Sequence, residues 1–175
     1  MTPEDATVVL DPDFDAVDLG TGSDPRFLAA GDLNGDGRLD VAAARMQMGM
    51  TSGDVVVLLD LPSGPGPDSV LSHPELVRPT AVALGDVDRD GQLDVVVSSR
   101  PGETQSGLPT VSRVLVFRQR AAGVFDDGEP LVLGGLNAPS HVLVRDLDGD
   151  GDPDLVVSNA GGGAATALAL YHGGF

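Results

Sequence analysis

The sequence contains no cysteine, no lysine and no tryptophan. Without cysteine there is no disulfide framework, no thiolate metal site and no cysteine nucleophile. All 10 basic residues are arginines, against 27 acidic residues, and the net charge is −17. Nucleic acid and anionic membranes are excluded as partners on this balance, because binding them requires a basic patch. Metal cations are the natural partners of such a chain.

Aromatic residues make up only 3% of the chain, so valine, leucine and alanine must form its core. No apolar run is long enough for a transmembrane helix, and Met1–Asp5 shows no signal-peptide pattern. Glycine (24 residues) and proline (13 residues) are abundant and separate short apolar runs. This pattern is typical of short strands joined by turns. The length of 175 residues indicates a single domain.

Three segments of the chain align without gaps. They are GDLNGDGRLDVAAA from Gly31, GDVDRDGQLDVVVS from Gly85 and RDLDGDGDPDLVVS from Arg145. Their first aspartates lie 54 and 60 residues apart. An internal repeat of this period predicts a modular fold in which neighbouring units bury a shared core.

Each repeat is flanked by short apolar runs that predict strands. We expect first strands at 26–30, 80–84 and 140–144, second strands at 39–44, 93–98 and 154–158, third strands at 54–59, 112–118 and 167–171, and fourth strands at 69–72 and 130–133. No window has a sustained helical period. Four short antiparallel strands per unit are typical of a β-propeller blade.

The predicted fold is therefore all-β, with three blade-like units at approximately 21–72, 75–133 and 135–175. The last unit stops at its third strand, and residues 6–20 are expected to supply a closing strand. Closed propellers typically have four to eight blades. We therefore expect either a homodimer that forms a six-bladed ring or a fragment of a longer propeller.

The repeated pattern, Asp-x-Asp/Asn-x-Asp-Gly-x-x-Asp, has the composition of a calcium loop. Oxygen-bearing side chains occupy positions one, three, five and nine, and the glycine at position six permits the positive φ that folds the loop back. The residue at position seven can offer its backbone carbonyl. These five or six oxygens suit a hard cation with six to eight ligands, whereas zinc would require histidine or cysteine.

The candidate metal ligands are Asp32, Asn34, Asp36, Arg38 (carbonyl) and Asp40 in the first loop, Asp86, Asp88, Asp90, Gln92 (carbonyl) and Asp94 in the second, and Asp146, Asp148, Asp150, Asp152 (carbonyl) and Asp154 in the third. The first loop has the fewest carboxylates, so its site is predicted to be the weakest. About three calcium ions per chain are expected. The alternative is a set of metal-free Asx turns that cap hairpins.

Other motifs fit this pattern less well. An EF-hand requires a glutamate at position twelve, where the three loops have Ala43, Val97 and Val157. His73 and His141 have no partner at metal-ligand spacing, and His172 could approach His141. No nucleophile elbow accompanies the serines, and the clustered aspartates are better used as metal ligands than as glycosidase carboxylates. No catalytic residue is predicted.

The units resemble the FG-GAP and VCBS repeats of integrin α-chain propellers and bacterial extracellular proteins. The core Asp-x-Asp/Asn-x-Asp-Gly-x-x-Asp carries this resemblance in all three units, although the Phe-Gly element survives only loosely, near Phe125 and Phe175. The resemblance implies a β-propeller with calcium in the hairpin loop of each blade, an extracellular or periplasmic location, and a role in adhesion or ligand recognition.

Three functions are compatible with this sequence. The first is a non-enzymatic, calcium-stabilised interaction or adhesion module. The second is a lectin-like propeller, which is disfavoured because sugar sites usually stack on aromatic rings and Tyr171 is the only tyrosine. The third is a non-catalytic scaffold within a larger extracellular enzyme.

Overall fold

The computed structural model describes residues 21, 24–47, 52–60, 69–100, 111–131, 136–160 and 168–172. Within these ranges the chain forms β-strands and no helix, so the predicted all-β class is confirmed. It follows that no helix in these ranges is long and apolar enough to cross a membrane. The closing strand expected within residues 6–20 falls outside the described residues.

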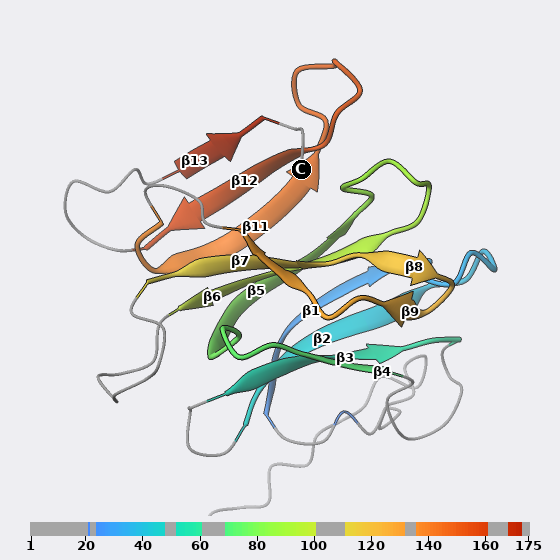
Figure 1. The fold of residues 1–175 in the computed structure, drawn as a ribbon, viewed down its shortest axis with the longest axis horizontal. Helices are drawn as coiled ribbons and strands as arrows, with labels where there is room; N and C mark the ends of the chain where they lie inside the picture. Colours follow the sequence, from blue (N-terminus) through green and yellow to red (C-terminus); the bar gives the residue numbers. More distant parts are fainter. Residues whose placement is uncertain are drawn as a thin grey trace, which may run out of the picture.

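Most strands belong to three antiparallel sheets (Figure 1). The first sheet has the order β1-β2-β3-β4, the second β5-β6-β7-β10 and the third β11-β12-β13, while β8 and β9 form a separate hairpin. The strand bounds are β1 Pro25–Gly31, β2 Asp40–Met46, β3 Gly53–Leu58, β4 Ser69–Ser72, β5 Arg78–Gly85, β6 Asp94–Arg100, β7 Arg113–Phe117, β8 Gln119–Ala121, β9 Val124–Phe125, β10 Glu129–Leu131, β11 Pro139–Arg145, β12 Asp154–Asn159 and β13 Leu168–Tyr171.

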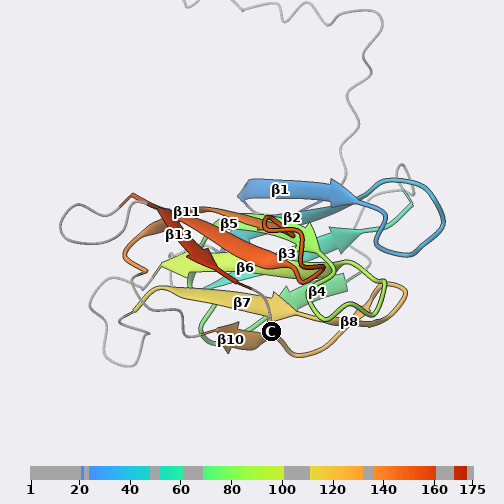
Figure 2. The same cartoon turned by 90° about the horizontal axis from the view of Figure 1, so that it is seen from above.

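The second sheet packs between the other two. The first strands of the outer sheets, β1 and β11, both contact β5 (Figures 1 and 2). Val97 on one face of β6 joins the core shared with the first sheet, and Val96 on its other face joins the core shared with the third. Burial on both faces explains the three consecutive valines at 95–97 in β6. Small sheets that stack face to face in this way are propeller blades, as predicted.

The glycines at the ends of β1 and β5 allow this close stacking. A Cβ on Gly31 would lie 2.9 Å from Leu93 Cδ1, just before β6, and 3.0 Å from Leu84 Cδ1 of β5. A Cβ on Gly85 would lie 2.5 Å from Val144 Cγ1 of the third sheet. The equivalent position in the third sheet is Arg145, which is exposed. A glycine therefore permits the close contact at each of the two junctions between described sheets.

Several strand limits differ from the sequence-based prediction. Leu39 and Leu93 were predicted within strands, but β2 and β6 begin one residue later, and Leu39 is 67% exposed. The fourth strand predicted at 130–133 is β10, Glu129–Leu131, within the described residues. The hairpin of β8 and β9 was not predicted, because it depends on a turn at Gly123, whose φ is +70°, within a segment too short to show periodicity.

Candidate metal centre

Each acidic loop joins the first two strands of its sheet. The hairpin registers end in equivalent pairs, with Gly31 opposite Asp40, Gly85 opposite Asp94 and Arg145 opposite Asp154. The three loops therefore occupy the same place in each blade, and they lie along one edge of the molecule (Figure 1).

The aspartate at position one organises the backbone of its own loop. In the second loop, Asp86 Oδ1 accepts a hydrogen bond from Asp90 N at 3.0 Å, and Oδ2 accepts one from Gly91 N at 3.0 Å. Asp32 and Asp146 accept equivalent bonds from Gly37 and Gly151. The loop backbone is thus wrapped around a carboxylate, which holds the acidic side chains close together in the folded chain.

The glycine at position six has the backbone conformation that the sequence predicts. Gly37, Gly91 and Gly151 have φ values of +86°, +89° and +89°, in a region that side chains with a Cβ rarely adopt. At position four the second loop has Arg89, with φ +62°, where the other loops have glycine. The three loops therefore share one backbone shape despite this substitution.

The aspartate at position nine is buried and ties the loop to the neighbouring strand. Asp94 Oδ2 accepts a hydrogen bond from Val87 N at 2.8 Å, and Oδ1 accepts one from Gln119 N at 2.8 Å. Asp40 likewise accepts bonds from Leu33 N and Asp60 N. These carboxylates are 0% exposed. Position nine is therefore a structural clamp as well as a candidate ligand, a role that the sequence pattern did not indicate.

Burial raises the pKa of Asp94 to about 6, against the effect of the hydrogen bonds from Gln119 N and Val87 N. The nearby carboxylates of Asp88 and Asp90 raise it further. In the first loop, the Arg38 backbone N–H is the main cause that lowers the pKa of Asp36 to about 2. The interior of the second loop therefore favours a positive charge, which a bound cation would supply.

Three carboxylates converge in the second loop. Asp86, Asp88 and Asp90 each place one oxygen within 4.8 Å of the others. Two ligands on one calcium ion at about 2.4 Å can be at most about 4.8 Å apart, so all three oxygens can reach a single ion. Asp88 Oδ1 is buried and has no hydrogen-bond partner. Arg118 and Arg120 lie 3.9 and 3.5 Å from Asp88 Oδ2 but leave Oδ1 without a partner. Because an unpartnered buried carboxylate oxygen is costly, a cation bound at Oδ1 would be favourable, and this loop fits calcium.

The third loop repeats this cluster and adds a histidine. Asp146, Asp148 and Asp150 have oxygens within 4.8 Å of one another. His172 Nδ1 lies 3.4 Å from Asp148 Oδ2 and 3.2 Å from Asp154 Oδ1. The sequence pattern did not indicate His172 as a neighbour of the third loop. Its position just after β13 places it at the loop through strand pairing.

In the first loop an arginine binds the acidic groups. The Arg38 guanidinium donates to Asp36 Oδ2 at 2.8 Å and lies 2.5 Å from Asp60 Oδ1. Asn34 stands at position three and also donates to Asp60. This loop has fewer carboxylates and an internal cation, which is a structural reason to expect the weakest metal affinity here.

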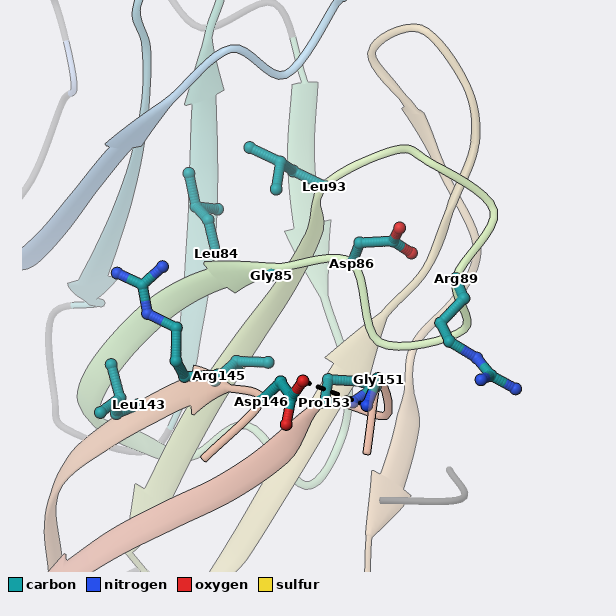
Figure 3. A pocket seen from close by; sticks show the side chains of 11 residues that line it. Leu84, Gly85, Asp86, Arg89, Leu93, Leu143, Arg145, Asp146, Gly151 and Pro153 are labelled. Atoms are coloured by element: carbon teal, nitrogen blue, oxygen red, sulfur yellow. Dashed lines mark hydrogen bonds between the residues drawn. The ribbon is translucent and has the colours of Figure 1, made fainter. Parts of the chain in front are cut away.

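A cavity of about 440 Å³ separates the second and third loops (Figure 3). Asp86 and Arg89 line it from the second loop, and Asp146 lines it from the third. Arg89 forms an ion pair with Asp152 of the third loop. The two acidic loops are therefore linked by a charged contact between blades.

The predicted ligands at positions one, three and five thus come together in the second and third loops. In the first loop, Asp32 Oδ1 and Asn34 Oδ1 both accept hydrogen bonds from Asp36 N. At position seven, the backbone N–H groups of Arg38, Gln92 and Asp152 donate to the aspartate at position five. The use of the carbonyls at position seven stays a prediction.

The sequence pattern did not predict the groups that reach the loops from the residues just after the third strand of each blade. These include Asp60, Gln119 and His172. Arg120 also lies 3.5 Å from Asp88. The only local signal for them is their position directly after an apolar run.

Comparison with known proteins identifies the repeats. Residues 25–58 match the model of the FG-GAP repeat, and residues 107–157 match that of the FG-GAP-like repeat. The chain is also 32% identical over 165 residues to integrin alpha-IIb of Homo sapiens, an alignment that covers 82% of this chain. It spans only 15% of the integrin's length. Together with the stacked antiparallel blades, these matches show that the chain belongs to the integrin-like FG-GAP repeat family.

Proposed function

We propose that this chain is a non-catalytic β-propeller module whose acidic loops bind calcium. The observation that carries the proposal is the second loop, where three carboxylates converge and Asp88 Oδ1 is buried without a hydrogen-bond partner. The donors are all oxygens, as calcium prefers. Calcium would neutralise the carboxylates and hold the hairpin to the rest of its blade. Its role would be structural.

Calcium titration of chelator-treated protein tests this proposal. Isothermal titration calorimetry should show saturable binding, with the second and third loops filling before the first. The order follows from the carboxylate count and from the Arg38–Asp36 contact. Magnesium should bind more weakly, because it requires a stricter octahedron. A titration in which the heat of injection shows no saturable binding up to millimolar calcium would refute the proposal.

The biological role that fits these features is interaction or adhesion outside the cell. The similarity to an integrin α chain supports this role, and the blades present their loops on rigid sheets, an arrangement that proteins often use for binding. Low-affinity calcium loops also suit an extracellular setting, where free calcium is abundant.

We further propose that the three blades are completed to a ring, with a second copy as the simplest partner. Both outer faces of the stack present apolar side chains. Leu28 on the first sheet is 73% exposed, and Leu143 on the third is 49% exposed. In the third sheet Leu143 aligns with Val156 and Leu170 across the strands. Arg145, however, stands where the two described junctions use glycine.

Sedimentation velocity tests this assembly. A dimer would sediment with a mass near twice 17.8 kDa. If the third sheet packs against another blade as the first two sheets do, Arg145→Gly should tighten association, because it removes the bulk at the junction. Leu143→Asp, which places a charge on the same face, should weaken it. A monomer at all concentrations, unaffected by either change, would reject the dimer.

A further inference from the structure

The third blade carries a cluster of metal-binding side chains that the acidic loop alone does not explain. Asp148, Asp154 and His172 each place one donor atom within 4.8 Å of the other two. His172 Nδ1 lies 3.4 Å from Asp148 Oδ2 and 3.2 Å from Asp154 Oδ1. Asp154 and His172 are not members of the carboxylate cluster of Asp146, Asp148 and Asp150. The third loop therefore has a second set of donors, and this set contains a nitrogen.

The histidine reaches the loop from a different strand. His172 directly follows β13, which pairs with β12 and with no other strand of the described part of the chain (Figure 1). Tyr171, the last residue of β13, stands opposite Leu155, the neighbour of Asp154 in β12. An ion held by the three residues would therefore join the end of this outer strand to the loop between β11 and β12.

The other two blades have no metal ligand at the position of His172. The strand pairing places Leu59 of the first blade and Arg118 of the second at this position. A leucine has no donor atom, and an arginine is always protonated, so neither side chain can bind a metal. The imidazole of histidine is the commonest metal ligand in proteins. The third loop is thus set apart from the other two by the type of ligand available to it.

Both carboxylates of the cluster are oriented by the backbone. Asp150 N donates to Asp148 Oδ1 at 3.1 Å, and Leu147 N donates to Asp154 Oδ2 at 2.9 Å. Each carboxylate is thereby held through one oxygen and presents the other oxygen to His172. Hydrogen bonds that fix a ligand in this way are typical of metal sites.

The spacing and the exposure of the donors also fit a bound ion. Ligands about 2.0–2.2 Å from a tetrahedral ion lie about 3.3–3.6 Å apart, close to the separations of 3.2 and 3.4 Å from His172 Nδ1. The Asp154 side chain is 1% exposed, so little water competes for its carboxylate, whereas the His172 side chain is 61% exposed. The site therefore combines a buried anionic ligand with a path of entry from solution.

We infer that Asp148, Asp154 and His172 form a binding site for a divalent transition-metal ion of the zinc class. The nitrogen donor decides the class, because calcium and magnesium take oxygen ligands, whereas zinc binds imidazole and carboxylate together. Three protein ligands leave the fourth position of a tetrahedral ion to water. The bound ion would hold the end of β13 against the loop and so stabilise the third blade. The inference does not depend on calcium binding, although the two ions would compete because both use Asp148.

Nuclear magnetic resonance of the histidine rings tests this site in the full chain. The protein is treated with a chelator, the chelator is removed, and zinc chloride is titrated without calcium. The ring signals of His172 should shift saturably and reach their end point at one zinc ion per chain. The signals of His73 and His141 should not move, because neither residue belongs to the cluster. His141 is exposed, as His172 is, so it reports any non-specific binding of zinc to surface histidines.

Two matched variants separate the site from general effects of zinc. His172→Asn removes the imidazole at an exposed position and should weaken zinc binding at least about tenfold, a loss that even changes beside the ligands of a metal site produce. His141→Asn should bind zinc as the unmodified protein does. Zinc should raise the melting temperature of the unmodified protein and of His141→Asn, but not that of His172→Asn.

Three results would each overturn the inference. They are the lack of a saturable shift of His172 up to millimolar zinc, equal shifts of His141 and His172, and unchanged zinc binding by His172→Asn. His172 would then serve only as a protonated ion-pair partner of Asp148 and Asp154. Calcium binding without zinc binding would reject this inference alone, and zinc binding without calcium binding would reject only the calcium proposal.

Discussion

Chelation should lower the melting temperature of this protein by on the order of 10 °C or more, and added calcium should restore it. At a calcium concentration of about 100 times the dissociation constant, each occupied loop contributes about 2.7 kcal/mol to folding stability. For a chain of this length, about 1 kcal/mol corresponds to roughly 2–4 °C. The converging carboxylates would meanwhile repel one another in the metal-free protein.

Two single variants separate metal binding from the structural clamp. Asp88→Ala removes the carboxylate whose Oδ1 has no hydrogen-bond partner. It should reduce stability only when calcium is present, by about 2.7 kcal/mol under the same saturation. In a chelator its effect should be small, because it removes one of three mutually repelling charges together with the ion pairs of Asp88 Oδ2 with Arg118 and Arg120, at 3.9 and 3.5 Å. Melting curves in calcium and in a chelator measure both effects.

Asp94→Ala is the matched comparison, because it removes a carboxylate that accepts hydrogen bonds from Val87 N and Gln119 N. Leaving two buried N–H groups unpaired costs about 1–3 kcal/mol each. This variant should therefore be destabilised in both conditions. Equal losses for Asp88→Ala with and without calcium would show that position three is also purely structural and would contradict the metal assignment.

Gly85→Ala should destabilise the protein by about 1–3 kcal/mol, a typical cost of overpacking a close contact. The added Cβ would lie 2.5 Å from Val144 Cγ1 and 2.7 Å from Val144 Cβ. Neither atom is the end of a flexible side chain, so one blade must move away from the other. The φ of Gly85 lies outside the left-handed region, so the substitution adds no backbone strain and tests packing alone.

Arg145→Ala, measured at a concentration at which the protein is monomeric, is the control for this change, because it occupies the same strand position in the third sheet and is exposed. A surface substitution of this kind should alter stability by less than about 0.5 kcal/mol. Denaturant unfolding with calcium present would measure both variants. If Gly85→Ala proves as mild as Arg145→Ala, the close approach of the second and third sheets is wrong.

The features that could be predicted from the sequence are those that depend on a pattern of residues within one short segment. The acidic loops follow from nine consecutive positions, and the φ values at Gly37, Gly91 and Gly151 agree with the turn that the pattern requires. The strands on either side followed from short apolar runs between turns. The repeat then placed the three loops at equivalent positions, because a repeated sequence forms a repeated unit.

The parts that sequence could not predict depend on contacts between distant strands. His172 meets Asp154 through the pairing of β12 with β13, and Gln119 reaches Asp94 from the start of β8. A cavity of about 300 Å³ gathers residues from three sheets, among them Arg26, Arg78 and Ser140. None of these contacts leaves a pattern within one segment, so each required the arrangement of the blades. The need for glycine at position 85 is likewise explained only by the close contact with Val144 of the next sheet.

The most direct test of the calcium loops is a high-resolution crystal structure grown with calcium. The second loop should hold a spherical density peak contacted by Asp86, Asp88 and Asp90, with six to eight oxygens at about 2.3–2.6 Å. The same peak should occur in the third loop and be weakest in the first. Loops that contain only water at hydrogen-bonding distances would contradict calcium binding.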